Sequence, residues 1–287
     1  MPVIDVLDST MNYREIGTGT PLVFLHGNPT SSYLWRHILP AVGDSGRRLA
    51  PDLIGMGESG KPAIDYSFDD QARYLDAWFD AMELDQVVLV GHDWGGALAF
   101  DWATRHPDRV RGIAFNETIV KPMSWDEFPA AGHDLFRSIK TPGVGEAMFE
   151  SNAFIDGLDA GTVAGNLTEA DLDVYRKPYP DAASRKPMLR WARSMPLGGE
   201  PADVVAKVER YDEWMAASTD VPKLMLTFEP GPGTMQGQVL TDWCIANIAS
   251  LDIAHHDLVA GHHAPEDHPA AVADSISAWL DKHDLAR

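Results

Sequence analysis

The stretch VVLVGHDWGG, residues 87–96, decides the fold of this chain. Its run of aliphatic residues predicts a buried strand, and the glycines around Asp93 predict a sharp turn that leads directly into a helix. An elbow of this kind presents the side chain at its apex above the end of a sheet. The apex residue of such elbows is commonly a serine, whereas this chain has the carboxylate of Asp93.

A carboxylate at the apex offers different chemistry from a hydroxyl. Asp93 is already an anion at neutral pH, so it needs no neighbouring base to become a nucleophile. A carboxylate is a poor catalyst for cleaving peptides or carboxylic esters. It can, however, displace a leaving group at saturated carbon and form an alkyl ester that water later hydrolyses. The elbow therefore favours substrates with a carbon–halogen bond or an epoxide ring.

Length and composition are those of one large core, or of one core with an inserted subdomain. The chain has 287 residues, of which 45% are hydrophobic. We expect no membrane span, because no apolar run reaches about eighteen residues, and the first residues lack the pattern of a secretory signal. The single cysteine, Cys244, excludes an intramolecular disulfide and a cysteine-based metal cluster. We therefore expect a cytoplasmic protein that uses no metal and no cofactor.

The charge balance limits the partners. With 43 acidic and 23 basic residues, the formal net charge is −20. Such a surface repels the phosphates of nucleic acids and of anionic lipids, so we expect neither nucleic acid nor membrane as a partner.

Strand-like and helical segments alternate along most of the chain, which predicts an α/β fold with a mostly parallel, eight-stranded sheet and helices on both faces. The pattern between residues 121 and 214 is helical, with proline and glycine interruptions. We therefore expect a main domain formed by residues 1–120 and 215–287, and an inserted helical cap formed by residues 121–214. The expected strands are residues 3–7, 11–16, 21–26, 48–51, 87–90, 110–115, 223–228 and 251–258, and residues 31–42 are expected to be helical.

Several polar residues follow strands of this sheet. Ligands of parallel sheets bind outside the carboxyl ends of the strands. The turn that contains His262 follows the last strand, where the chain order nucleophile, acid, histidine needs its base. Its task is to take a proton from the water that attacks the ester, so it must be neutral at that moment. His263 is its direct rival, and pleat alternation lets at most one of His255 and His256 face the pocket.

Two glutamates compete for the role of the acid that orients the base. Glu117 follows the strand 110–115, and Glu229 follows the strand 223–228, so both satisfy the chain order. Glu229 stands in the sequence EPGPG, where capping a turn is a sufficient role for it. We prefer Glu117, because it follows a wholly apolar run.

A departing halide needs hydrogen-bond donors in a dry pocket, because an unpaired anion is costly in a low dielectric. Trp94 offers an indole N–H beside the nucleophile, and Asn28 offers amide N–H groups from the neighbouring loop. Their backbone N–H groups are also placed to form an oxyanion hole.

Taken together, these residues resemble the haloalkane dehalogenases of the α/β-hydrolase superfamily over nearly the whole chain. The loop HGNP, residues 26–29, and the elbow GHDWGG, residues 91–96, carry the resemblance. Epoxide hydrolases share the elbow but typically have an aromatic residue after H-G and an aspartate acid after a later strand, so Asn28 and Glu117 fit the dehalogenases better. Fluoroacetate dehalogenases typically follow the nucleophile with an arginine, so Trp94 indicates an uncharged substrate.

The resemblance implies a role for each of these residues. Asp93 is then the nucleophile, His262 the base and Glu117 the acid, and Asn28 with Trp94 binds the halide. Three residues of the cap match the apolar pocket lining of the family: Phe154, Tyr179 and Pro196. The chain departs from the family at His263, where an aromatic residue is usual, and at Pro265, where glutamine is usual.

The sequence thus predicts a hydrolase that converts a small halogenated alkane and water into an alcohol, a halide ion and a proton. An epoxide hydrolase is the nearest alternative, with Tyr175 and Tyr179 as possible acids, although Pro178 makes a regular helix between them unfavourable. A luciferase-like oxygenase and a non-catalytic receptor for small molecules are two further alternatives on the same fold.

Overall fold

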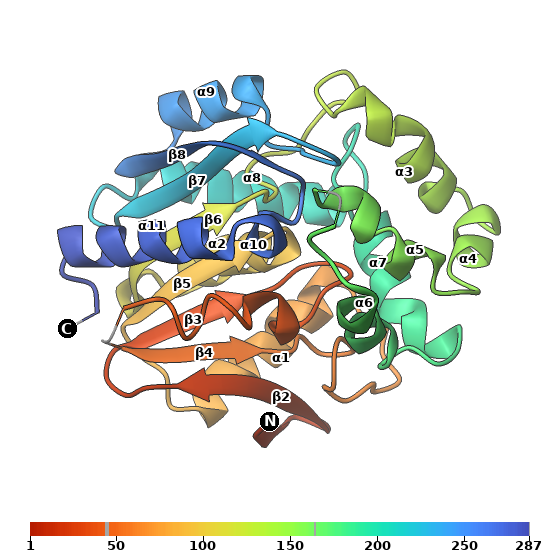
Figure 1. The fold of residues 1–287 in the computed structure, drawn as a ribbon, viewed down its shortest axis with the longest axis horizontal. Helices are drawn as coiled ribbons and strands as arrows, with labels where there is room; N and C mark the ends of the chain where they lie inside the picture. The colour runs from red at the N-terminus through yellow and green to blue at the C-terminus, as the bar shows by residue number, and fades with distance from the viewer. Residues whose placement is uncertain (44–45, 164, 287) are drawn as a thin grey trace.

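The computed structural model describes residues 1–43, 46–163 and 165–286. Within these residues, eight strands form one sheet in the order β1-β2-β4-β3-β5-β6-β7-β8 (Figure 1). β2 pairs antiparallel with both β1 and β4, and the remaining neighbours are parallel. The predicted α/β fold with a mostly parallel sheet is therefore confirmed. The strands are β1 Val3–Val6, β2 Ser9–Ile16, β3 Pro21–Leu25, β4 Arg47–Pro51, β5 Val87–His92, β6 Val110–Asn116, β7 Lys223–Pro230 and β8 Leu251–Ala260.

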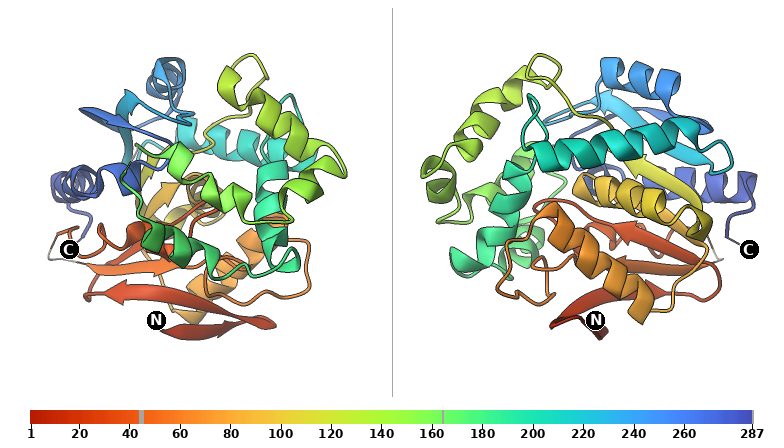
Figure 2. Two further views of the ribbon diagram at one scale, coloured as in Figure 1. Left: turned by 45° about the vertical axis from the view of Figure 1, so that its right-hand side comes forward. Right: turned by 180° about the vertical axis from the view of Figure 1, so that it is seen from behind.

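Strand residues point alternately to two separate hydrophobic cores, as the two-residue period of a strand requires. In β3, Leu22 and Phe24 belong to one core, whereas Val23 and Leu25 belong to the other. The first core is covered by α11 (Pro269–Lys282) and the 3-10 turn η1 (Ser32–Trp35), and the second by helices including α1 (Phe68–Ala81), α2 (Trp94–Arg105) and α8 (Ala202–Ala217). Figure 2 shows α1, α2 and α8 side by side on the rear face of the sheet.

The segment 31–42 differs from the prediction of a helix. It contains only η1, which is followed by turns. Its backbone groups are bound by side chains from β4 and the loop after it: Asp52 accepts a hydrogen bond from the Ser32 N–H at 2.7 Å, and Arg48 donates to the carbonyl of Val42 at 2.6 Å. These tertiary bonds compete with a regular helix for the same backbone groups, while the apolar side chains still reach the core.

In its described residues, the segment between β6 and β7 consists of helices joined by turns and loops, with isolated β-bridges and no longer strand. Figure 1 shows α3 to α7 gathered beyond one end of the parallel strands. α8 lies instead along the main sheet, where Arg210 forms an ion pair with Asp101 of α2 at 2.8 Å. The domain boundaries at residues 121 and 214 remain a prediction. The helices in this segment are α3 His133–Lys140, α4 Val144–Met148, α5 Ala153–Asp156, α6 Glu169–Arg176, α7 Lys186–Arg193 and α8, with 3-10 turns η3 Ala130–Gly132, η4 Asp159–Gly161 and η5 Ala183–Arg185.

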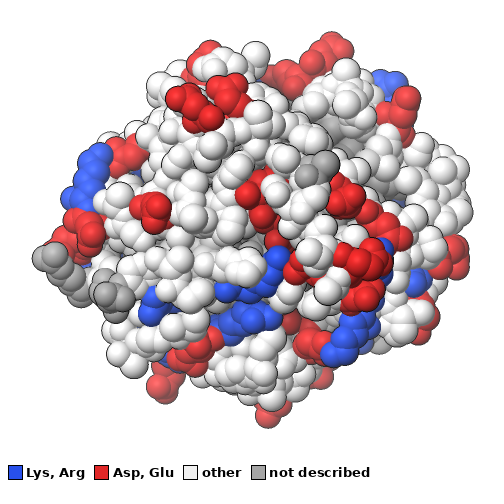
Figure 3. Space-filling model, viewed as in Figure 1, with Lys and Arg blue, Asp and Glu red and all other residues white. Residues whose placement is uncertain are grey.

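Three further elements complete the described fold: η2 Pro107–Arg109, α9 Gln238–Asn247 and α10 Ala264–Asp267. Among the described residues, no helix has the length and apolar character that crossing a bilayer requires. On the face shown in Figure 3, acidic side chains are spread widely, and lysine and arginine form only a few small groups.

Candidate active site

Asp93 sits at the apex of a strained turn between β5 and α2. Its backbone has φ 51° and ψ −126°, a conformation that residues with a side chain rarely adopt. Neighbouring glycines make room for it: a Cβ atom on Gly95 would lie 2.1 Å from the carbonyl oxygen of Leu25, and one on Gly27 would lie 2.2 Å from Asp93 Oδ1. The turn places the carboxylate at the sheet edge with only 6% of the residue exposed.

The strand register brings the proposed acid next to the proposed nucleophile. His92, the last residue of β5, pairs with Asn116, the last residue of β6. Asp93 and Glu117 therefore follow neighbouring strands at the same level. A hydrogen bond of 2.7 Å from Thr118 Oγ1 to the backbone carbonyl of Asp93 joins the two strand ends.

The two carboxylate oxygens of Asp93 have different partners. Oδ1 accepts a hydrogen bond from the backbone N–H of Asn28 at 2.7 Å. Oδ2 lies 3.6 Å from Nε2 of His262. One oxygen is thus held by a backbone donor, whereas the other faces the imidazole.

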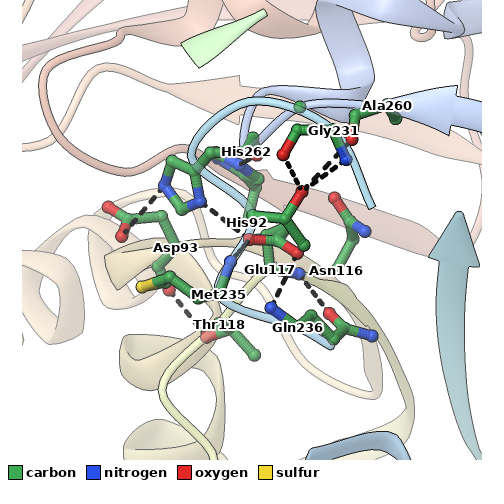
Figure 4. A network of polar contacts seen from close by, with 12 residues as sticks. His92, Asp93, Asn116, Glu117, Thr118, Gly231, Met235, Gln236, Ala260 and His262 are labelled. Atoms are coloured by element: carbon green, nitrogen blue, oxygen red, sulfur yellow. Dashed lines mark hydrogen bonds and ion pairs between the residues drawn. The ribbon is translucent and has the colours of Figure 1, made fainter. Parts of the chain in front are cut away.

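His262 lies between two carboxylates. Its Nδ1 is 2.9 Å from Glu117 Oε2, so Asp93, His262 and Glu117 form a row (Figure 4). Glu117 is fixed by the loop after β7, because its carboxylate accepts backbone N–H groups from Met235 at 2.7 Å and Gln236 at 3.0 Å. The structure thus brings together the triad residues that the sequence singled out.

The rival residues lie elsewhere. The side chain of Glu229 is 53% exposed and approaches His255 at 3.6 Å, well outside the triad. His256 contacts Ser275 at 2.8 Å. His263 is buried beside His262, with ring centroids 4.8 Å apart, but it is His262 that contacts both Asp93 and Glu117.

The electrostatics of the row favour a charged imidazole in the resting protein. Burial alone would lower the pKa of His262, but the hydrogen bonds and charges of Asp93 and Glu117 outweigh it and raise the pKa to about 10. Burial would raise the pKa of Asp93, yet the hydrogen bond and charge of His262 lower it instead. Asp93 is therefore an anion, as the proposed nucleophile has to be. If it became a neutral ester, His262 would lose a negative neighbour and release its proton more easily.

The two proposed halide donors contact one helix, α7, of the segment inserted between β6 and β7, which is called the insertion below. Trp94 is 2% exposed, and its indole stacks on that of Trp191 with centroids 4.5 Å apart and planes at 26°. Asn28 donates one amide hydrogen, through Nδ2, to the carbonyl of Met188 at 3.1 Å, and the amide carries a second one. Met188 and Trp191 are three residues apart in α7, so one face of this helix reaches both donors.

The chain is similar to known proteins over nearly its whole length. A family profile described as alpha/beta hydrolase fold matches residues 20–156. A haloalkane dehalogenase of Mesorhizobium japonicum is 44% identical over 99% of this chain and 92% of its own length. The chain belongs to the haloalkane dehalogenase family. A second relative of the same name, from Sphingobium indicum, is 41% identical over 96% of this chain and 94% of its own length.

Solved structures of haloalkane dehalogenases share the whole fold. The enzyme from Bradyrhizobium elkani is 42% identical and superimposes with a TM-score of 0.93, covering 100% of this chain and 99% of that one. The enzyme from Agrobacterium tumefaciens is 38% identical, with a TM-score of 0.91 over 98% of this chain and 96% of that one.

The three cap residues that were matched to the dehalogenase pocket have other contacts in the structure. Phe154 packs on Phe149 with centroids 4.7 Å apart. The hydroxyl of Tyr179 accepts from the N–H of Gly57 at 3.4 Å. The carbonyl of Pro196 accepts from the N–H of Met123 at 3.2 Å. Their role in lining a pocket remains a prediction.

Sequence reasoning missed Met188 and Trp191. The only signal in the sequence is their spacing of three residues in a segment with a helical pattern. That spacing predicts that the two residues share a helix face, but it does not predict that this face contacts Asn28 and Trp94.

Proposed function

We propose that this protein hydrolyses carbon–halogen bonds of small uncharged haloalkanes and releases an alcohol, a halide ion and a proton. The observation that carries the proposal is the unequal environment of the Asp93 carboxylate. Oδ1 is bound by the Asn28 N–H, and Oδ2 is the oxygen that faces His262. A carboxylate held in this way has one oxygen for attack and one that becomes an ester carbonyl.

In the first step, Oδ2 of Asp93 attacks the carbon that carries the halogen. The carbon–halogen bond breaks as the carbon–oxygen bond forms, and the halide leaves with the electron pair. The Nε1–H of Trp94 and the second Nδ2–H of Asn28 donate hydrogen bonds to the ion. Both donors are neutral, so they bind the halide without adding a charge to the site. The product is a neutral alkyl ester of Asp93.

In the second step, water hydrolyses this ester. Its formation lowers the pKa of His262, so the ring becomes neutral and can take a proton from water. The water oxygen attacks Cγ of Asp93, and negative charge develops on Oδ1. The Asn28 N–H already donates to Oδ1 at 2.7 Å, so the oxyanion donor is in place before the reaction starts. The Cγ–Oδ2 bond then breaks, and the leaving oxygen takes the remaining proton of the water and departs as the alcohol. Asp93 is again an anion and His262 is again protonated, and the proton that His262 lost after ester formation is the product proton.

The tyrosines offered for an epoxide hydrolase are engaged in other contacts. Tyr175 donates its hydroxyl to Glu266 at 2.5 Å, and the hydroxyl of Tyr179 contacts the sulfur of Met56 at 3.4 Å. These bonds tie both groups to the main domain and argue against a role in protonating an opening epoxide. We therefore propose a dehalogenase rather than an epoxide hydrolase. We also propose that residues 121–214 form the cap, that the protein is cytoplasmic, and that the reaction uses no cofactor and no metal.

His262→Ala tests the assignment by separating the two steps. We expect this variant to release one equivalent of bromide from a bromoalkane and then stop, because Asp93 can still attack but no base activates water. Mass spectrometry of the Asp93 peptide should show the added alkyl group. Sustained turnover, or a burst without the alkyl group, would contradict the mechanism.

Two observations on the original protein would favour the alternative functions. Light emission with a coelenterazine-type substrate would favour the oxygenase, and inertness towards halides, epoxides and esters would favour the receptor.

A further inference from the structure

Three histidine rings pack together beside the nucleophile, although the proposed reaction uses only one. The ring centroids of His92 and His262 are 5.0 Å apart, those of His92 and His263 are 5.5 Å apart, and those of His262 and His263 are 4.8 Å apart. Figure 4 shows His92 and His262 next to each other. One ring nitrogen from each residue lies within 4.8 Å of the other two.

Two of these rings carry a buried nitrogen without a hydrogen-bond partner. His92 is fully buried and His263 is 4% exposed, and Nδ1 of each is unpartnered among the described residues. Nε2 of His92 lies 2.7 Å from the carbonyl oxygen of His262. Because a carbonyl only accepts, this nitrogen carries the hydrogen, and Nδ1 of the neutral ring keeps a free lone pair. A buried lone pair with no donor is costly, so it points to a ligand that the residues around it do not supply.

The ring of His263 is held so that its free nitrogen faces away from the insertion. A Cβ atom on Gly161 of η4 would lie 3.1 Å from Cδ2 and 3.4 Å from Nε2 of His263. The backbone N–H of His263 also donates to the carbonyl of Gly161 at 3.2 Å. The edge with Cδ2 and Nε2 therefore packs on η4, and the edge with Nδ1 points the other way.

We propose that His92, His262 and His263 form a binding site for one divalent transition-metal ion of the Zn²⁺ class, and that the bound ion inhibits the enzyme. Neutral imidazole is a preferred ligand of zinc, copper and nickel. The ion must therefore displace the proton that Asp93 and Glu117 otherwise keep on His262, so binding releases one proton. Zinc–nitrogen bonds are about 2.0–2.1 Å long, so nitrogens within 4.8 Å of one another need to move inwards by less than about 1 Å each.

The surroundings suit a cation. Whichever nitrogen His262 contributes, a carboxylate is close to it, because Nδ1 is 2.9 Å from Glu117 and Nε2 is 3.6 Å from Asp93. A metal on either nitrogen also removes the base that the second step needs. The inhibition rests on the proposed function, whereas the binding of metal does not.

The binding test uses the full-length protein, freed of metals with EDTA and then dialysed. We expect calorimetric titration with ZnCl₂ to show one site with a dissociation constant that rises at least tenfold in His263→Phe. Co²⁺ should give the visible absorption of a tetrahedral site in the original protein, and this absorption should be lost in the variant. His263→Gln serves as a second variant that keeps a polar side chain, if the phenylalanine variant does not fold.

The matched control is His255→Phe. His255, Glu229 and Asp257 form a second group with potential ligand atoms, but all three are exposed. If His255→Phe rather than His263→Phe abolishes the zinc site, or if both variants bind zinc as the original protein does, the proposal is wrong.

The activity test measures bromide release at increasing ZnCl₂. We expect at least a tenfold loss of rate that EDTA reverses, and in His263→Phe an inhibitory concentration at least tenfold higher. Zinc that binds through His263 without slowing bromide release would refute the inhibition but not the site. An absence of bromide release without zinc would refute the proposed function, and the calorimetry would still decide the metal site.

Discussion

The proposed triad and the proposed halide donors are held in place by different parts of the molecule. Glu117 and His262 are fixed by polar contacts within the main sheet and its loops, such as the N–H groups of Met235 and Gln236 on Glu117. Trp94 and Asn28 are contacted by α7 of the insertion, through the ring of Trp191 and the carbonyl of Met188. Substitutions in the insertion should therefore change how tightly Trp94 and Asn28 bind the halide. The positions of His262 and Glu117 should not change.

Replacing the proposed nucleophile has the largest expected effect, because Asp93 contacts both Asn28 and His262. In Asp93→Ala no oxygen is left to attack carbon, so bromide release should fall by about 10⁴-fold or more. Ion chromatography of bromide released from a bromoalkane measures this directly. Asp93→Asn is a poorer choice, since deamidation would regenerate the acid. Bromide release at the original rate from the alanine variant would remove Asp93 from the mechanism.

The two glutamates allow a paired test of the triad side. Glu117→Gln removes the charge next to His262 Nδ1, so we expect the turnover rate to fall on the order of 10²-fold. Glu229→Gln is the matched control, because this side chain is exposed and contacts His255 instead, and its turnover should not change. Equal losses in both variants, or a loss only in Glu229→Gln, would show that the acid was wrongly chosen. Steady-state kinetics with circular dichroism as a folding check measures both.

The contrast between the two parts of the site also explains what the sequence could predict. Asp93, Glu117, His262 and Asn28 each follow a strand, and the carboxyl ends of parallel strands meet at one edge, so local patterns sufficed to bring them together. The contact of Trp191 with Trp94 depends on how an inserted helix docks, and helical spacing carries no information about that. The segment 31–42 shows the same limit, because distant Asp52 and Arg48 bind its backbone groups.

The charge state of His262 offers a third test. Removing the negative charge of Asp93 in Asp93→Ala should lower the His262 pKa from its value of about 10 in the original protein. NMR titration of labelled histidine rings measures this shift. If the His262 pKa stays unchanged, loss of the Asp93 charge on ester formation does not make His262 release its proton, and this part of the mechanism is wrong.

The same shift has a consequence for stability. Because the folded pKa of about 10 exceeds the ordinary value of 6.5, protonated His262 stabilises the fold fully below about pH 6.5, and this stabilisation is lost as the pH rises towards 10. Urea unfolding across this range should therefore show a smaller loss of free energy of unfolding in Asp93→Ala than in the original protein.

The smallest expected effect belongs to the stack between the insertion and the halide donor. Trp191→Leu removes the ring that packs on Trp94, and aromatic pairs contribute about 0.5–1.5 kcal/mol, so the inhibition constant for bromide should rise by about two- to tenfold. Turnover in the hydrolytic step should change less, because the leaving group has gone by then. Trp102→Leu is the matched control: it breaks a comparable stack, with Phe79 at 4.3 Å, between α1 and α2. If both variants weaken bromide inhibition equally, the cause is a general loss of stability. The contact between α7 and Trp94 is then not what positions the halide donor.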